Sequence, residues 1–433
     1  MLLLLALGGG CGVSAEDISR WKQTQKGPER LRAALADAHL RSELRAQAAL
    51  ALVDIGRCDE AAAVLREVEE PARRAILRLA MPQLVARLQE GPADRVPTEA
   101  QIRAKDALFV LRLLGAPEER KLADEALTAW VVADLSGRLS AGSIGSERIL
   151  LDIGARAQGA LLAVLSRASL GSPNLLPAAS LLGRLGDRES RRRAAEQIMG
   201  LLRPVLSQGQ SSGVEEGMRA LGALRAPEAA RFLAALAERG PVPLRQRAFA
   251  ALGAAGDPTA LELALQVAWD RREPGGVREA AFSYLERLGE IAVDGLCRII
   301  ADPKEGGERG QLARYRAVEA ALAAGGAAAV GRVLKALPEE GTYDREDFVA
   351  FVVRQLTALG PTARPYVRTA LQSQSWVARA AALMALGEAG EPQDAEAMAA
   401  HFGDPARLRG RGWTETTVGE LARRQAERLR SKR

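Results

Sequence analysis

Residues 244–260 read LRQRAFAALGAAGDPTA, and this stretch decides the fold. Its first part is a run of residues with high helix propensity that ends in Leu252-Gly253. We expect Gly253 to take the left-handed conformation that ends a helix. Asp257 and Pro258 then predict the start of a second helix, because aspartate caps free N–H groups and proline suits the first turn. The stretch therefore predicts a helical hairpin.

The same pattern of residues returns along the chain. Successive copies are separated by glycine-to-glycine steps of 32, 36, 31, 36, 36, 35 and 27 residues, the period range of stacked helical hairpins. Such hairpins pack only on their neighbours, so 433 residues need no division into globular domains. We predict an all-α fold, an α-solenoid of stacked helical hairpins. The copies end at Ile153-Gly154, Leu185-Gly186, Leu221-Gly222, Leu252-Gly253, Leu288-Gly289, Ala324-Gly325, Leu359-Gly360 and Leu386-Gly387.

The hairpin of residues 244–260 resembles a HEAT repeat, of the short type first noted in phycobilin lyases. Residues 377–392 repeat its pattern, and Gly186-Asp187 keeps part of it. The resemblance covers residues 150–403 and, more weakly, 42–135. It implies a curved surface for protein partners. It does not imply bilin-lyase activity, because only the scaffold pattern matches and no pigment-binding residue is identifiable.

Residues 1–11 carry a different pattern. Leu2 to Leu7 form an apolar run, and Gly8-Gly9-Gly10-Cys11 follows. This segment resembles a bacterial lipoprotein signal, which implies lipidation at Cys11 and a lipid anchor in the cell envelope. It departs from that family in having Gly8 in place of a larger aliphatic residue and in lacking a basic start. The other interpretation is an apolar N-terminus that packs on the first helix.

Two expectations follow from the lipoprotein resemblance. The missing basic residues suggest that the true start lies upstream, and Gly12, in place of an aspartate, favours the outer over the inner membrane. We find no further apolar stretch of spanning length, so we expect an anchored rather than a threaded protein. The predicted segments are a lipoprotein-type signal (1–11), a tether and first helix (12–41), irregular hairpin repeats (42–149), HEAT-like repeats (150–404) and a basic tail with a capping helix (405–433).

The basic charge is concentrated in the tail. The chain has 60 basic and 54 acidic residues, and residues 405–433 hold nine of the basic and three of the acidic ones. The rest is therefore neutral, which gives no support for nucleic-acid binding by the repeats. Thr416 and Thr417 predict the cap of a final helix that closes the array, binds an anionic surface, or does both. The candidate residues for the anionic surface are Arg423, Arg424, Arg428, Arg430, Lys432 and Arg433.

The sequence offers little for catalysis. Residues 209–213 match a G-x-S-x-G pattern around Ser211, but no strand is expected before it, so we interpret the segment as a loop. His39 and His401 have no partners at metal-ligand spacing, and Cys58 and Cys297 lie in apolar helical contexts. We therefore expect a non-enzymatic protein-binding scaffold with no cofactor or metal, no small-molecule substrate and no nucleic acid. The alternative is a cytoplasmic HEAT-repeat regulator or an accessory subunit of an enzyme complex.

Overall fold

The chain is an all-α solenoid, as the sequence predicts. The computed structural model describes residues 13–90, 96–138, 142–209, 212–302, 308–339 and 345–431. Within these ranges the backbone is helical, and the β pairing is limited to one antiparallel bridge between Arg407 and Thr417. The chain divides into two units, Met1–Ala220 and Leu221–Arg433, each with its own packing.

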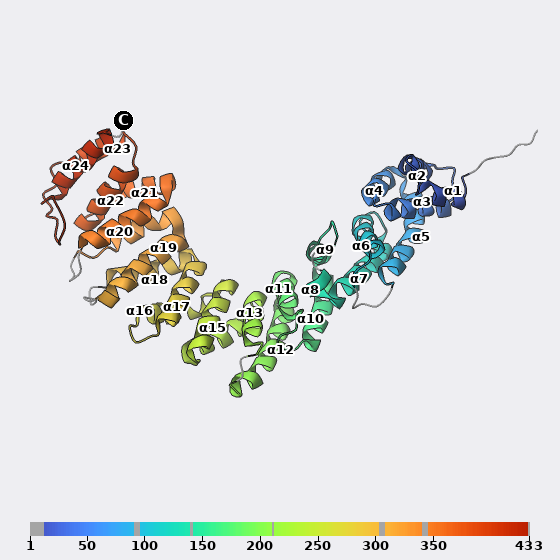
Figure 1. Cartoon of the computed structure of the whole chain (residues 1–433), viewed down its shortest axis with the longest axis horizontal. Helices are drawn as coiled ribbons and strands as arrows, with labels where there is room; N and C mark the ends of the chain where they lie inside the picture. Colours follow the sequence, from blue (N-terminus) through green and yellow to red (C-terminus); the bar gives the residue numbers. More distant parts are fainter. Residues whose placement is uncertain are drawn as a thin grey trace, which may run out of the picture. The chain divides into compact units, whose positions relative to one another are not determined.

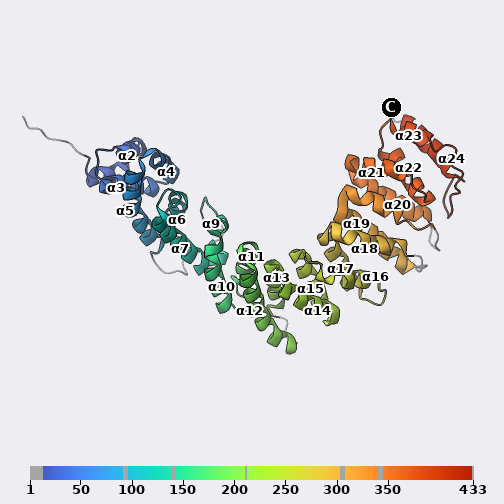
Figure 2. The same ribbon diagram turned by 180° about the vertical axis from the view of Figure 1, so that it is seen from behind.

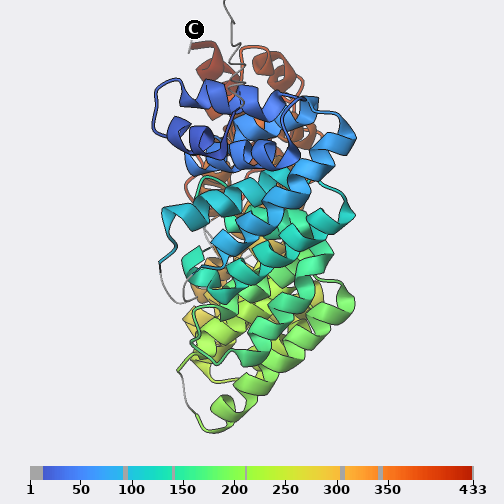
Figure 3. The ribbon, with the colours of Figure 1, turned by 90° about the vertical axis from the view of Figure 1, so that its right-hand side faces the viewer.

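Unit 1 stacks its helices in successive layers, which Figure 3 shows from α1 and α2 onward. Its N-terminal part is less regular, because the long helix α5 packs on α3, α6 and α7 alike. The helices are α1 (Ala15–Trp21), α2 (Gly27–Ala36), α3 (Ser42–Asp54), α4 (Cys58–Glu67), α5 (Glu70–Leu88), α6 (Glu99–Leu111), α7 (Pro117–Ala133), α8 (Leu135–Arg138), α9 (Ser146–Ile153), η1 (Gly154–Ala157), α10 (Gln158–Arg167), α11 (Leu175–Leu185) and α12 (Arg188–Ser207).

Unit 2 is a regular succession of hairpins that ends at α23 and α24 (Figures 1 and 2). The boundary between the units falls inside the first helix of this list. The helices are α13 (Val214–Leu224), α14 (Pro227–Arg239), α15 (Val242–Ala255), η2 (Pro258–Ala260), α16 (Leu261–Trp269), α17 (Gly275–Leu288), α18 (Glu290–Ala301), α19 (Glu308–Lys335), α20 (Arg345–Ala358), η3 (Gly360–Ala363), α21 (Arg364–Ala370), α22 (Trp376–Ala389), α23 (Asp394–Ala399) and α24 (Val418–Ser431).

The segment predicted as a tether and first helix (12–41) contains two helices, α1 and α2. Helices α1 and α2 both pack on α3, and α2 also packs on α4. Ile18, Leu31 and Leu35 are buried in these contacts. Removing such side chains from water favours the folded segment, so residues 15–36 belong to the array rather than to a tether that leads into it.

The glycine of the repeated pattern has a different role from the predicted one. Gly253 lies inside α15, which continues to Ala255 and ends at the left-handed Gly256 (φ 66°). The prediction that Gly253 ends the helix was wrong. A Cβ at Gly253 would stand 2.9 Å from Cδ of Arg287 and 3.5 Å from Cα of Tyr284, both on α17. The glycine therefore permits the next repeat's helix to approach closely.

Two other copies of the pattern use their glycine in the same way. A Cβ at Gly222 of α13 would stand 2.4 Å from the carbonyl oxygen of Ala251 on α15. A Cβ at Gly387 of α22 would stand 2.2 Å from Oε1 of Gln425 on α24. Four positive-φ glycines elsewhere instead separate the two helices of a hairpin: Gly154, Gly289, Gly326 and Gly360.

The predicted helix starts are confirmed. The Asp257 carboxylate accepts a hydrogen bond from the Thr259 N–H (2.8 Å) at the start of η2, which leads into α16. The Asp187 carboxylate accepts from the Ser190 N–H (2.7 Å) and caps α12. Each cap satisfies a donor that the first turn of a helix leaves free, so local sequence alone sets these boundaries.

Arginines connect successive repeats beyond the apolar core. Arg245 of α15 forms a bidentate pair with Glu273 (2.6 and 2.7 Å), in which both side chains are less than one-fifth exposed. Arg379 of α22 donates to Asp404 (2.7 Å), with both side chains again mostly buried. Bidentate, mostly buried ion pairs are stronger than exposed ones. These pairs therefore stabilise the contacts between successive hairpins.

Two described stretches are long and apolar enough, by length and composition, to cross a membrane: Ser146–Arg167 and Ala313–Lys335. The expectation that no such stretch follows residue 11 was therefore wrong. Each stretch is bent at a left-handed glycine, Gly154 (φ 69°) in the first and Gly326 (φ 55°) in the second. Each is consequently a pair of shorter helices within the array and not one continuous helix.

Candidate functional site

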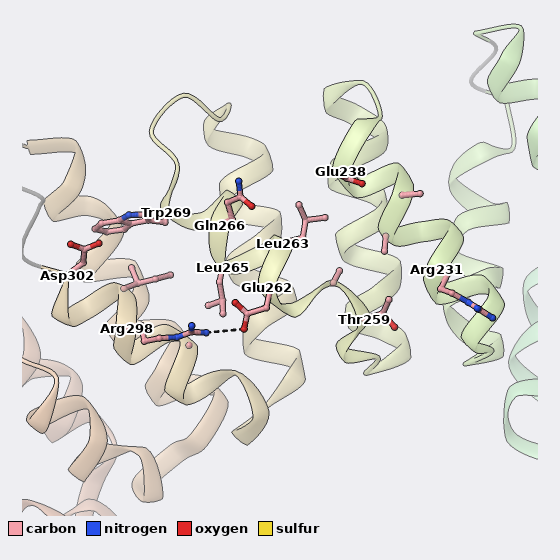
Figure 4. A pocket seen from close by; sticks show the side chains of 15 residues that line it. Arg231, Glu238, Thr259, Glu262, Leu263, Leu265, Gln266, Trp269, Arg298 and Asp302 are labelled. Atoms are coloured by element: carbon pink, nitrogen blue, oxygen red, sulfur yellow. Dashed lines mark hydrogen bonds and ion pairs between the residues drawn. The ribbon is translucent and has the colours of Figure 1, made fainter.

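The candidate site is a groove in unit 2 formed by α14, α16 and α18, the second helices of three consecutive repeats (Figure 4). Its volume is about 760 Å³. The first helices of these repeats pack behind it, because α15 contacts both α14 and α17, and α17 contacts α16. The array therefore places side chains from three repeats along one continuous surface.

The floor of the groove is apolar and closely packed. Leu265 and Ile299 are almost fully buried, and Trp269, the last residue of α16, is partly exposed. Gly295 of α18 faces Leu265 so closely that an added Cβ would stand 2.4 Å from its Cδ1. This contact lets α16 and α18 pack closely under the groove, which Trp269 also lines.

The rim of the groove is charged. Glu262 of α16 and Arg298 of α18 form an ion pair (3.0 Å) in which both side chains are more than half exposed. Figure 4 shows Trp269 and Asp302 toward one end and Arg231 of α14 toward the other. Exposed pairs of this kind contribute little to stability, so their charges are available to a partner.

The polar side chains that line this groove are of few kinds. Its described residues comprise carboxylates, arginines, one threonine and one glutamine, but no histidine, cysteine or lysine. Across the rim, Glu262 and Arg298 pair with each other and are both largely exposed, so the two side chains remain accessible from the groove.

Unit 1 has a second groove, between α7 and α10, with a volume of about 880 Å³. Ala129, Val132, Ala160 and Val164 line its apolar part. At the other end lies Asp124, which is 3% exposed and pairs with Arg112 (3.0 Å) beneath the groove and with Arg156 (2.7 Å) on its rim. Arg112 itself is fully buried and also contacts Asp152. This network ties α6, α7, α9 and η1 together.

The sequence did not identify either groove. Their lining residues come from helices about 35 residues apart, and no local motif marks them. The available signal was Trp269, because the chain has only five tryptophans and this one ends a helix beside a charged turn. The alanines and leucines that line the grooves recur at the same helical spacing as those of the core, so the sequence does not distinguish the two groups.

Three of the residues predicted for an anionic surface have other contacts in the structure. Arg423 donates to the carbonyl oxygen of Phe402 (2.9 Å) and Arg424 contacts Glu415. Arg428 lies 3.8 Å from Glu388, and Arg430 is exposed near the end of α24. Lys432 and Arg433 lie outside the described residues.

Helix α24 packs on the last hairpin of the described chain. It packs on α22 and α23 through a buried face that includes Leu421, Ala422 and Leu429. The Thr417 hydroxyl accepts from the Glu420 N–H (3.2 Å), and the Glu420 carboxylate accepts from the Thr416 N–H (2.7 Å). Both predicted threonines therefore define the start of the helix.

The remaining sequence candidates do not assemble into a site. His39 is exposed and His401 is partly buried, and among the described residues no three His, Cys, Asp or Glu side chains cluster as metal ligands. Burial raises the pKa of the Cys297 thiol to about 11, and burial also raises that of Cys58. Cys11 and Ser211 lie outside the described residues.

Comparison with known proteins identifies neither a family nor an activity for this chain. No family model and no curated protein matches this chain. Similar solved structures include the RNA-binding domain of yeast Puf5p bound to MFA2 RNA, at 11% identity over 89% of this chain and 98% of that one, with a TM-score of 0.35. Importin beta follows at 12% identity, 93% and 76% coverage, and a TM-score of 0.25.

UNC-45 from Drosophila melanogaster is similar at 12% identity over 96% of this chain and 64% of that one, with a TM-score of 0.21. These structures are helical repeat proteins, and the present chain is one by its own fold. TM-scores this low identify neither a partner nor an activity. The exclusion of nucleic acid as a partner therefore stays a prediction.

Proposed function

We propose that this chain is a non-enzymatic scaffold of HEAT-like repeats that binds another protein, and that the groove of α14, α16 and α18 is its docking site. The observation that carries the proposal is Trp269, an accessible aromatic side chain in an apolar floor, in a groove whose rim carries Arg298 and, toward the other end, Arg231. Tryptophan and arginine dominate the binding energy of protein interfaces, especially where an apolar centre is surrounded by a polar rim.

The composition of the groove also suits the centre of a protein interface. The groove extends over three helices, and its charged rim combines two arginines with Glu238, Glu262 and Asp302. A partner segment that places an apolar side chain beside Trp269 removes it from water, and rim charges then favour one orientation of the partner. We expect no cofactor, metal or small-molecule substrate in this function.

Photo-crosslinking from within the groove tests the docking site. A photoreactive amino acid at Gln266, which is exposed and lines the groove, is compared in living cells with one at Ser283, exposed on α17 outside it. We expect a discrete adduct from position 266 that is absent from position 283. Trp269→Ala should reduce that adduct at least tenfold, since a tryptophan anchor contributes 2 kcal/mol or more. Equal adducts from both positions, or an adduct indifferent to Trp269→Ala, would refute the groove as the docking site.

We further propose that the scaffold is anchored to the bacterial cell envelope through a lipid on Cys11, with the outer membrane favoured. The support is the sequence of residues 1–12, an apolar run followed by glycines and a cysteine. Two acyl chains, or one chain with a basic patch, hold a protein at a bilayer without any spanning helix.

Metabolic labelling with palmitate tests the anchor. We expect label and membrane recovery for the wild type, expressed with any upstream in-frame codons, and loss of both for Cys11→Ala. Unlabelled, soluble recovery of both proteins would reject the anchor and favour a cytoplasmic regulator or an accessory subunit of an enzyme complex. The outcome of the crosslinking experiment does not depend on the lipid anchor, because Gln266 and Trp269 lie far along the chain from Cys11.

A further inference from the structure

The segment between α23 and α24 presents three arginines at the surface. Arg407, Arg409 and Arg411 are all exposed. The segment is closed at its base by an antiparallel bridge between Arg407 and Thr417, in which the Leu408 N–H donates to the Thr416 carbonyl (3.0 Å). Two hydrogen-bonded ends therefore hold the segment as a defined loop rather than a free tail.

The loop is also fixed near its tip. Trp413 packs edge-on against Trp376 of α22, with ring centroids 6.4 Å apart and an angle of 71°. Gly410 (φ 123°) and Gly412 (φ 89°) take conformations that favour glycine, and they flank Arg411. The backbone thus turns at both sides of Arg411 while the aromatic contact anchors the loop to the last repeat.

The acidic residues around this loop have other partners. Glu415 pairs with Arg424, Glu420 accepts from the Thr416 N–H (2.7 Å), and Asp404 pairs with Arg379 (2.7 Å). None of the three loop arginines forms an ion pair with a described residue. Three positive charges are therefore concentrated on one loop without compensation.

This placement differs from the one expected from the sequence. Three of the arginines predicted for an anionic surface, Arg423, Arg424 and Arg428, contact groups of the last repeats and the loop. The uncompensated charge lies instead on the loop before α24. In the sequence, Arg407, Arg409 and Arg411 belong to the same basic tail as the arginines of α24, and no local pattern distinguishes the two groups.

We propose that Arg407, Arg409 and Arg411 bind the phosphate headgroups of an anionic lipid bilayer. Guanidinium groups bind phosphate oxygens in a bidentate manner, and three exposed groups on one loop suit an extended anionic surface better than a small enclosed anion. Stacked nucleic acid is a poorer fit, because the one aromatic residue of the loop, Trp413, is engaged with Trp376. The proposal does not depend on acylation at Cys11.

Vesicle binding by the full-length Cys11→Ser protein tests this inference without a lipid anchor. The vesicles consist of phosphatidylcholine with or without phosphatidylglycerol. Each basic side chain near an anionic bilayer strengthens binding about fivefold, so a triple variant with Arg407→Gln, Arg409→Gln and Arg411→Gln should bind the anionic vesicles about 100-fold more weakly. Because the three side chains are exposed, we expect an unchanged circular dichroism spectrum.

A matched double variant, Arg424→Gln with Arg428→Gln, removes two arginines that already have acidic partners. We expect it to bind the anionic vesicles within about threefold of the parent protein, because its lost charges are already paired. Equal binding by the parent and the triple variant would overturn the proposal, as would an equal loss in the double variant. Binding of a single-stranded oligonucleotide or polyphosphate without binding of anionic vesicles would overturn it too.

Discussion

Replacing Gly222 by alanine tests whether close helix contact sets the repeated pattern. The new Cβ would stand 2.4 Å from the carbonyl oxygen of Ala251 and 3.1 Å from its Cα. These are backbone atoms, so relief to an ordinary contact of 3.4 Å requires α13 and α15 to separate by about 1 Å. Overpacking of this kind costs about 3 kcal/mol, while alanine gains about 1 kcal/mol of helix propensity.

The expected net effect of Gly222→Ala is therefore about 2 kcal/mol of lost stability. Gly331→Ala is the matched control, because Gly331 lies in the second part of α19, is exposed and has open space around the position of a Cβ. It should gain about 1 kcal/mol from helix propensity alone. Both variants make the same chemical change in the same unit, so their opposite signs isolate the helix contact.

Hydrogen exchange measured by mass spectrometry is the suitable assay, since repeat arrays open locally and not always in one transition. For Gly222→Ala we expect amide exchange in α13 and α15 to accelerate about 30-fold, the equivalent of 2 kcal/mol. For Gly331→Ala we expect slower exchange in α19. Slower exchange in α13 and α15 after Gly222→Ala would refute the close-contact reasoning.

Three further predictions concern buried charges and thiols. Arg112→Ala should lower the free energy of unfolding by about 3–5 kcal/mol, because it leaves the buried Asp124 with only the exposed Arg156 as a partner. The double variant Arg112→Met with Asp124→Leu should lose less stability in chemical denaturation than either single change. Burial acts to raise the pKa of the Asp404 carboxyl, but hydrogen bonds from Arg379 and the Ala406 N–H hold that pKa below its usual value. The stability that this carboxylate contributes is therefore present above about pH 4 and is lost as the pH falls through the lower pKa of the folded state. The urea midpoints of Asp404→Asn and the wild type should differ at neutral pH and converge in acid. A difference that stays constant with pH would contradict this reasoning. Cys297, with its pKa raised to about 11, should be alkylated about 100-fold more slowly at pH 8 than in the urea-unfolded chain, and equal rates would contradict its burial.

The repeat period predicts the architecture because hairpin formation depends on local patterns. Runs of alanine and leucine form helices, and Asp187 and Asp257 cap the helices that follow them. A capping side chain bonds a backbone N–H within three residues, so the local sequence is enough to predict these helix starts. The final helix α24 was predictable for the same reason, since Thr416 and Thr417 both contact Glu420.

The candidate sites depend on contacts that no local pattern encodes. Trp269, Arg231 and Arg298 line one groove only because three hairpins stack in register. Likewise, Arg424 and Arg411 look alike in the sequence, yet one pairs with Glu415 and the other is exposed and unpaired among the described residues. Packing decides which arginine pairs with an acidic residue, and the composition of the tail does not predict these pairs.

The sequence by itself determined that this chain is a helical repeat array, where most hairpins begin and end, and that its excess charge lies after residue 404. The tertiary structure decided that Gly222, Gly253 and Gly387 permit close helix contacts, which surfaces form grooves, and which arginines are uncompensated. The physical reason is range. Helix propensity and capping act over one turn of the chain, whereas packing and ion pairing join residues about one repeat apart.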